Sequence, residues 1–67
     1  MKITLNNRTE ELEAETLTIQ ELIELKKFTF KLLITKLNGA LVRKEHRDST
    51  RISDGDKVDV IHLISGG

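Results

Sequence analysis

The sequence predicts one α+β domain, in which a single helix packs on one face of a mixed sheet of four or five strands. Three observations predict this class: an alternating apolar pattern at the start of the chain, one segment with helical periodicity, and further apolar segments separated by tight-turn residues. A chain of 67 residues closes around one small core. We therefore expect residues 1–64 to form a single domain and residues 65–67 to form a flexible tail.

The first strand is expected at the very start of the chain. Met1, Ile3 and Leu5 alternate with polar residues, which is typical of a strand with one buried face. The Asn-Asn-Arg-Thr sequence of residues 6–9 favours a turn, and a short edge strand over residues 14–17 is expected to complete a hairpin. The glutamate-rich residues 10–15 are interpreted as a solvated hairpin tip.

The helix is expected to begin at Thr18. Thr18 and Glu21 have the spacing of a capping box, in which two side chains satisfy free backbone amides of the first turn. Ile19, Leu22, Ile23 and Leu25 then share one broad apolar face. The pattern predicts about ten residues of helix, ending near residue 27 or 28. Lys26 falls within the apolar sector, so its side chain must extend to solvent or the helix must fray there.

The second half of the chain contains three further strand candidates separated by turns. They cover residues 31–37, 40–43 and 57–64. Asn38 and Gly39 form a tight-turn dipeptide because both residues tolerate positive φ, and residues 54–56 form a second turn. The segment before that turn is polar except for Ile52, which we expect to fill the core.

This order of elements is that of the ubiquitin-like β-grasp, in which the first and last strands lie parallel at the centre of the sheet. One helix covers only one face of such a sheet. The apolar residues expected beneath it are Met1, Ile3, Leu5, Leu33, Leu37, Val58 and Val60.

Four apolar side chains are left for the uncovered face: Leu32, Ile34, Ile61 and Leu63. Clustered apolar residues on an open sheet face indicate a protein-docking surface. The alternative is that loops shield these residues or that they are scattered exposed aliphatics.

Composition excludes several classes of function. Eleven basic and eleven acidic residues give zero net charge, whereas a nucleic-acid binder usually needs a cationic excess. No apolar run approaches the roughly eighteen residues of a membrane span, so we expect a cytoplasmic protein that binds neither nucleic acid nor membrane. There is no cysteine, which removes thiol chemistry and makes a structural zinc site very unfavourable.

The remaining candidates for metal binding or catalysis are weak. Four aspartates occur between residues 48 and 59, but their spacing is not that of a calcium-binding loop, and the Asp-Gly-Asp of residues 54–56 is interpreted as a turn. His46 lies in a charged loop, and His62 has no Ser, Cys or second His paired with it in a motif. We expect no catalytic residue and no bound metal or cofactor.

The chain ends in Ser65, Gly66 and Gly67 directly after the last expected strand. Residues without a Cβ make a narrow stalk, which can enter a channel that other side chains would obstruct. Beyond Ile64 such a tail reaches about 10 Å. We therefore expect the Gly67 carboxylate to be presented to other proteins.

Three segments together resemble the ThiS family of sulfur carriers in thiamine biosynthesis. They are residues 38–44 (Asn-Gly-Ala-Leu-Val-Arg-Lys), 54–61 (Asp-Gly-Asp-Lys-Val-Asp-Val-Ile) and 64–67 (Ile-Ser-Gly-Gly). The resemblance implies that a ThiF-like adenylating enzyme activates Gly67 with ATP, and that a cysteine desulfurase or another donor supplies sulfur to form a thiocarboxylate. It also implies that a ThiG-like thiazole synthase accepts the sulfur, and that the carrier itself is not an enzyme.

Three alternatives remain open at this point. The first is the small subunit of molybdopterin synthase, which uses the same tail chemistry. The second is a ubiquitin-like modifier, whose Gly67 would form an isopeptide bond with a lysine of a target protein. The third is a β-grasp interaction module in which the terminal diglycine has no chemical role.

Overall fold

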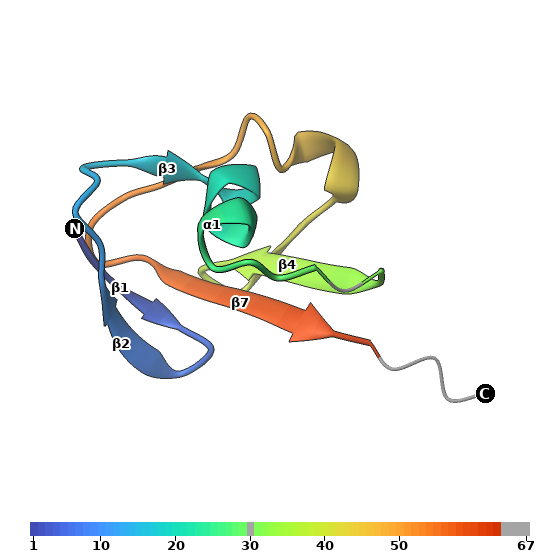
Figure 1. The fold of residues 1–67 in the computed structure, drawn as a ribbon, viewed down its shortest axis with the longest axis horizontal. Coiled ribbons are helices and arrows are strands. Elements are labelled where there is room, and N and C mark those ends of the chain that lie inside the picture. Colours follow the sequence, from blue (N-terminus) through green and yellow to red (C-terminus); the bar gives the residue numbers. More distant parts are fainter. Residues whose placement is uncertain (30, 64–67) are drawn as a thin grey trace.

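The computed structural model describes residues 1–29 and 31–63. A helix, α1, lies on one face of a five-stranded mixed sheet of order β2-β1-β7-β4-β5 (Figure 1). The strands of this sheet are β1 (Lys2–Leu5), β2 (Arg8–Glu11), β4 (Leu33–Leu37), β5 (Ala40–Val42) and β7 (Lys57–His62). The other elements are α1 (Ile19–Leu25), a 3-10 turn, η1 (Lys44–His46), and a two-stranded pair, β3 (Leu17–Thr18) with β6 (Arg51–Ile52).

The central pair of strands confirms the predicted ubiquitin-like β-grasp. β1 and β7 run parallel, with Leu5 opposite Val58, while β4 runs antiparallel to β7 on its other side. Strands from the two ends of the described chain thus lie next to each other at the middle of the sheet. β7 therefore joins the β1–β2 pair to the β4–β5 pair in one sheet.

The core lies between α1 and the sheet, where it was predicted. Ile3 and Leu5 of β1 and Val58 and Val60 of β7 are buried against the helix. Three other residues expected in the core, Met1, Leu33 and Leu37, are partly buried and pack against its edge. Ile52 is fully buried, as expected, and its strand β6 pairs with β3 beside the helix.

The first hairpin differs from the prediction. The edge strand is β2 (Arg8–Glu11), not residues 14–17, because the turn is only two residues long. Asn6 and Asn7 both have positive φ, 50° and 66°, and Asn tolerates this conformation, which matches the twist of a tight hairpin. Glu10 and Glu11 therefore belong to a strand rather than to a hairpin tip.

The start of the helix is as predicted, and the capping box is complete. The Thr18 hydroxyl accepts a hydrogen bond from the Glu21 amide at 3.1 Å, and the Glu21 carboxylate accepts one from the Thr18 amide at 2.8 Å. Leu17 packs against the core cluster that contains Leu22, which is consistent with a hydrophobic staple.

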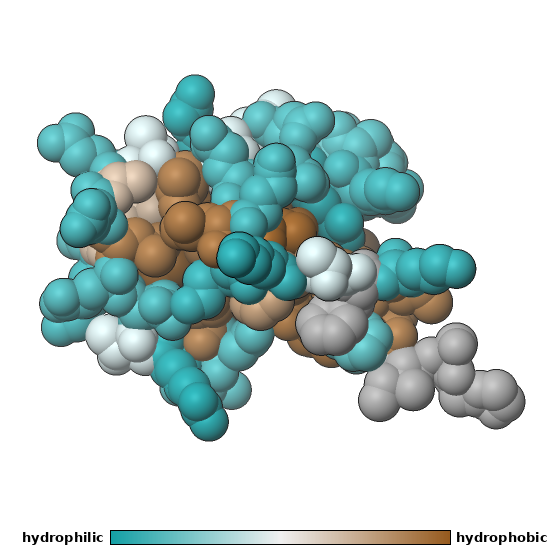
Figure 2. All heavy atoms as spheres, viewed as in Figure 1, coloured by the Kyte–Doolittle hydropathy of each residue, from teal (hydrophilic) through white to brown (hydrophobic). Residues whose placement is uncertain are grey.

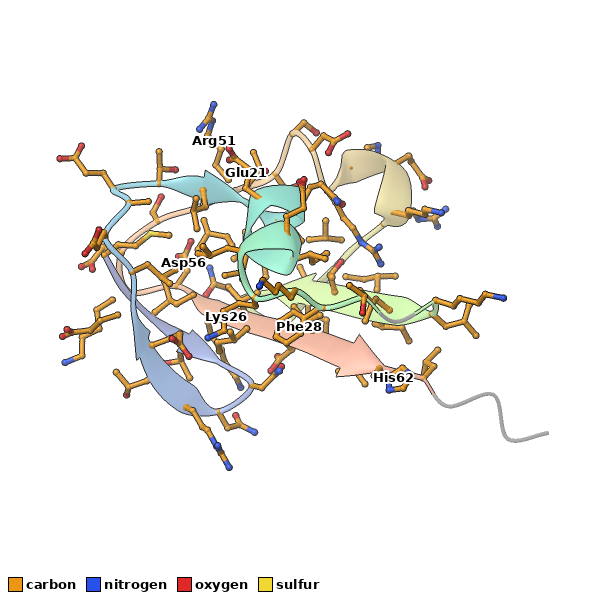
Figure 3. The ribbon with its side chains drawn as sticks, in the orientation of Figure 1. Glu21, Lys26, Phe28, Arg51, Asp56 and His62 are labelled. Atoms are coloured by element: carbon orange, nitrogen blue, oxygen red, sulfur yellow. The ribbon has the colours of Figure 1, made fainter. Side chains whose placement is uncertain are left out.

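The end of the helix is earlier than predicted, and Leu25 is exposed rather than buried. The helix stops at Leu25, and the chain reverses at Lys27, which has φ 57°. The Phe28 amide donates to the Ile23 carbonyl, and the Phe28 ring packs against the core beneath the end of α1 (Figure 3). At about 100° per residue, Leu25 lies beyond the edge of the arc formed by the buried Ile19, Leu22 and Ile23, and it is 56% exposed.

Candidate functional site

The predicted sulfur-bearing tail, Ser65, Gly66 and Gly67, lies outside the described residues, as does Ile64. The structure describes the strand that leads to it. β7 ends at His62, and the Leu63 amide donates to the carbonyl of Leu32, the residue before β4, at 3.0 Å, so the pairing continues to the last described residue.

Two asparagine side chains extend the hydrogen bonding of β7 beyond its strand partners. The Val60 amide donates to Asn6 Oδ1 at 2.8 Å, just past the point where β1 ends. At the start of β7, the Lys57 amide donates to Asn38 Oδ1 at 2.8 Å, and Asn38 Nδ2 donates to Asp56 at 3.1 Å. Sequence reasoning assigned both asparagines only to turns and missed these contacts with the central strand.

The four residues predicted to form a docking surface come together on the open face, meaning the face of the five-stranded sheet opposite α1. Ile34 of β4 lies directly opposite Ile61 of β7. Two residues further along the same pair of segments, the Leu63 amide donates to the Leu32 carbonyl. Leu32, Ile61 and Leu63 are 50%, 42% and 43% exposed, and Ile34 is half-buried. We call these four residues the open-face patch. It adjoins the end of β7, and its role in docking stays a prediction.

Leu41 was missed as a possible neighbour of this patch. It pairs with Lys36, which follows Ile34 by two residues and shares its face, and Leu41 is 61% exposed. Exposed Leu41 alternates with buried Val42 in β5, but a strand of three residues is too short for the sequence alone to assign its faces.

Arg47 is a buried residue that sequence reasoning left in a polar loop. It is only 9% exposed. Its Nε donates to Thr35 Oγ1 at 3.2 Å, and its Nη2 donates to the Leu33 carbonyl at 2.7 Å. A single arginine between polar residues has no periodicity, so no sequence signal marked it.

The acidic turn and the histidines form no site of their own in the described part of the chain. Asp54 accepts a hydrogen bond from the Lys2 amide, and Asp56 accepts one from the Ser53 amide, so both carboxylates stabilise the turn between β6 and β7. His46 and His62 are exposed, on η1 and at the end of β7. No group of three or more acidic or histidine side chains among residues 1–29 and 31–63 is arranged to hold a metal ion.

The carboxyl of Glu21 has a pKa below its ordinary value. The hydrogen bond from the Thr18 amide lowers the pKa of this carboxyl most, followed by the interaction with the Thr18 side chain; desolvation opposes them, and the positive charge of Arg51 makes the smallest contribution, which also lowers the pKa. Figure 3 shows Arg51 beside Glu21 at the start of α1. This interaction stabilises the helix cap and lies far along the molecule from the end of β7.

A family model described as the ThiS family matches residues 2–67 of the chain. The chain belongs to the ThiS family. The resemblance carried by the Asn-Gly, Asp-Gly-Asp and terminal Gly-Gly segments is thereby confirmed.

Relatives of this ThiS-family chain match it over nearly its whole length. The sulfur carrier protein ThiS of Bacillus subtilis (strain 168) is 26% identical over 65 residues, which is 97% of this chain and 98% of that protein. The crystal structure of a thiamine biosynthesis protein (ThiS) from Geobacter metallireducens is 30% identical, with a TM-score of 0.90 and all of both chains covered. An NMR solution structure of a thiamine biosynthesis protein from the same organism has a TM-score of 0.83 at 30% identity and covers all of this chain and 88% of that one.

The described part of this ThiS-family chain has no helix that is both long and apolar enough to cross a bilayer. Its one α-helix has seven residues, fewer than half of the roughly twenty that a span needs.

Proposed function

We propose that this chain is a sulfur carrier protein of thiamine biosynthesis and that it carries sulfur on the carboxyl group of Gly67. The observation that supports this most is membership of the ThiS family over residues 2–67, which includes the terminal diglycine. Similarity to the Bacillus subtilis protein named as a sulfur carrier, across nearly all of both chains, supports the same function.

The chemistry begins at a carboxylate, which is a poor electrophile. A ThiF-like adenylating enzyme joins Gly67 to the α-phosphate of ATP and releases pyrophosphate, so that AMP becomes the leaving group. A persulfide of a cysteine desulfurase, or another sulfur donor, attacks the acyl carbon and displaces AMP, forming an acyl disulfide. A thiol then cleaves the S–S bond and leaves a thiocarboxylate on Gly67, which a ThiG-like thiazole synthase accepts as its sulfur source.

The carrier supplies recognition and reach in this scheme, and its partners supply the reacting groups. Gly66 and Gly67 have no Cβ, so the tail is narrow enough for a confined active site. Gly67 is the fourth residue after Leu63 of the open-face patch, which corresponds to at most about 14 Å of extended chain. A partner that binds the open-face patch therefore keeps the Gly67 carboxylate within that distance of its own surface.

The direct test is the intact mass of the carrier after incubation with the adenylating enzyme, ATP and a sulfur donor. We expect the mass to rise by the difference between sulfur and oxygen. The matched control lacks Gly67: it should stay unloaded while its thermal unfolding matches that of the complete chain, because the buried core lies within residues 3–60.

Other outcomes contradict the proposal in distinguishable ways. A complete chain that gains no sulfur under these conditions refutes it. Covalent adducts with lysines of other proteins indicate a modifier instead. Transfer of the loaded sulfur to molybdopterin synthase but not to thiazole synthase indicates the molybdopterin pathway.

A further inference from the structure

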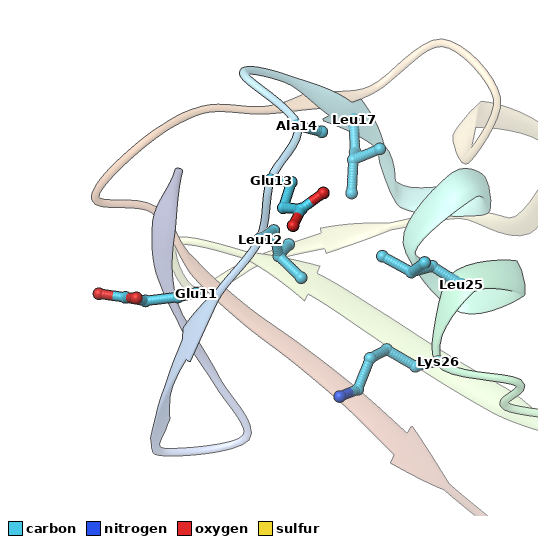
Figure 4. A pocket seen from close by; sticks show the side chains of 7 residues that line it. All are labelled: Glu11, Leu12, Glu13, Ala14, Leu17, Leu25 and Lys26. Carbon is cyan, nitrogen blue, oxygen red and sulfur yellow. The ribbon is translucent and has the colours of Figure 1, made fainter.

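A groove of about 480 Å³ lies between the segment that follows β2 and the C-terminal end of α1 (Figure 4). Its apolar lining comes from Leu12, Ala14, Leu17 and Leu25. Leu12 and Leu17 also pack against the core, which places the groove on the helix side of the sheet. The groove is therefore separate from the open-face patch.

The apolar surface of this groove has a specific structural origin. Leu25, the last helical residue, lies outside the arc formed by the buried Ile19, Leu22 and Ile23, so it is more than half exposed. Leu12 and Leu17 lie across from it and are only partly buried. Figure 2 shows the resulting apolar surface between the polar side chains of the helix layer and those of the β1–β2 hairpin.

The charge of the groove is negative. Its lysine, Lys26, is paired with Glu10 at 3.2 Å and is thus largely neutralised. The exposed side chain of Glu13 points into the space between Leu12 and Leu17 (Figure 4). Exposed Glu11 adds a second acid to the lining, and the N-terminal ammonium of Met1, which donates to the Leu12 and Ala14 carbonyls, offsets part of this charge.

We propose that this groove docks a basic, apolar segment of a partner protein. An aliphatic side chain of the partner inserts among Leu12, Leu17 and Leu25, and a neighbouring lysine or arginine pairs with Glu13. Apolar anchors that fill a pocket supply most of the affinity of such contacts, and opposite charge selects the partner and speeds its association. An acidic segment or an anionic lipid surface would meet like charge at Glu13.

The location of the groove gives this contact a distinct role. Because the groove and the open-face patch lie on opposite sides of the sheet, a partner in the groove leaves the patch and the end of β7 accessible. The carrier can thus bind a second protein while an enzyme holds the open face. This inference does not depend on sulfur loading, and its test uses the carrier alone.

The test is a titration of the isotopically labelled full chain with a short synthetic peptide of alternating leucine and lysine, followed by amide chemical shifts. We expect shifts at Leu12, Glu13, Leu17 and Leu25. A leucine–glutamate peptide and a serine–lysine peptide, which lack the charge and the apolar anchor respectively, should bind at least about tenfold more weakly.

Three variants sharpen the test. Glu13→Lys and Leu25→Ser should each weaken binding of the leucine–lysine peptide by about tenfold or more, since one reverses the charge and the other removes the apolar contact. Glu45→Lys, an exposed acid on η1, should bind as the unmodified chain does. Both groove positions are exposed, so all three variants should keep the amide spectrum of the folded protein.

Any of four results of the binding experiments would overturn the proposal. They are equal binding of the leucine–glutamate peptide, equal binding of the serine–lysine peptide, shifts confined to the open-face patch, and a loss with Glu45→Lys as large as that with Glu13→Lys. Self-association of the unliganded chain that Leu25→Ser abolishes would also overturn it, because the occupant would then be a second copy.

Discussion

The buried side chain of Arg47 connects the segment after η1 to β4 and, through Thr35, to β5, and all of its hydrogen-bond partners are uncharged. A buried charge is costly unless hydrogen bonds replace its hydration, and its guanidinium donates to Thr35 Oγ1 and to the Leu33 carbonyl. The Thr35 hydroxyl, itself fully buried, donates onward to the Val42 carbonyl at 2.7 Å. One side chain from the segment after η1 thereby links β4 and β5, and its removal would leave buried polar groups without partners.

Replacing Arg47 with alanine should therefore destabilise the fold. Hydrogen bonds to a charged group contribute about 1.5–3 kcal/mol, and we expect a loss of that size in the free energy of unfolding. Urea denaturation followed by circular dichroism measures it. Arg43→Ala, at an exposed arginine four residues earlier, is the matched control and should change stability by less than about 0.5 kcal/mol. Equal effects of the two substitutions would show that the Arg47 contacts add nothing.

At the scale of elements, α1 depends on its capping box because the helix has only seven residues. Isolated helices of this length are unstable in water, so the cap and the packing of Ile19, Leu22 and Ile23 must hold it. The cap also makes the helix sensitive to pH. The pKa of Glu21 is lowered in the folded protein, so its contribution to stability is present above the pKa of the unfolded chain and is lost as the pH falls through the folded value.

Glu21→Gln isolates this contribution, since glutamine keeps an acceptor for the Thr18 amide but has no charge. We expect the unmodified protein to be more stable than the variant at neutral pH, and the difference to shrink as the pH falls through and below the range in which carboxyls titrate. Urea unfolding of both proteins across that range measures the difference. A difference independent of pH would mean that the charge of Glu21 contributes nothing to the cap.

Elements with local chemical signals could be predicted from the sequence, and elements set by tertiary contacts could not. The capping residues and the Asn38–Gly39 turn carry their own signals, and both were located correctly. β2 was misplaced because its Arg-Thr-Glu-Glu sequence has no apolar alternation, and the register of the Asn6–Asn7 turn creates the strand. Leu25 was misassigned because it lies at the margin of the apolar arc, and the depth of packing decides that only Ile19, Leu22 and Ile23 are buried.

At the scale of the whole molecule, the order of the strands brings the apolar residues that alternate along β4 and β7 together on one face of the sheet. α1 and the β3–β6 pair lie on one side of the five-stranded sheet (Figure 1). Pairing of β4 with β7 then aligns the open-face patch on the other side. The patch could be predicted because alternation assigns faces once the topology is known. Leu41 and Arg47 could not, since a three-residue strand and a loop residue give too little pattern.

Charge placed in the open-face patch should interfere with docking. Ile61→Asp and Leu63→Asp should each weaken binding to the adenylating enzyme or to the thiazole synthase by about tenfold or more, because an aspartate at an apolar contact loses its hydration. Calorimetric titration measures the affinity, and thermal unfolding checks the fold. Thr9→Asp, an exposed position on the same face at the far edge strand, is the control. Unchanged binding of both patch variants would remove the docking role of this face.

The central position of β7 also affects how the protein is made. Until β7 has been synthesised, the β1–β2 and β4–β5 segments lack the strand that joins them in the sheet. Apolar residues such as Ile3 then have no sheet to pack into, and incompletely folded chains of this kind are open to proteolysis. A chain cut short before β7 is therefore expected to be a substrate for proteases, because β1 and β4 are joined only through that strand.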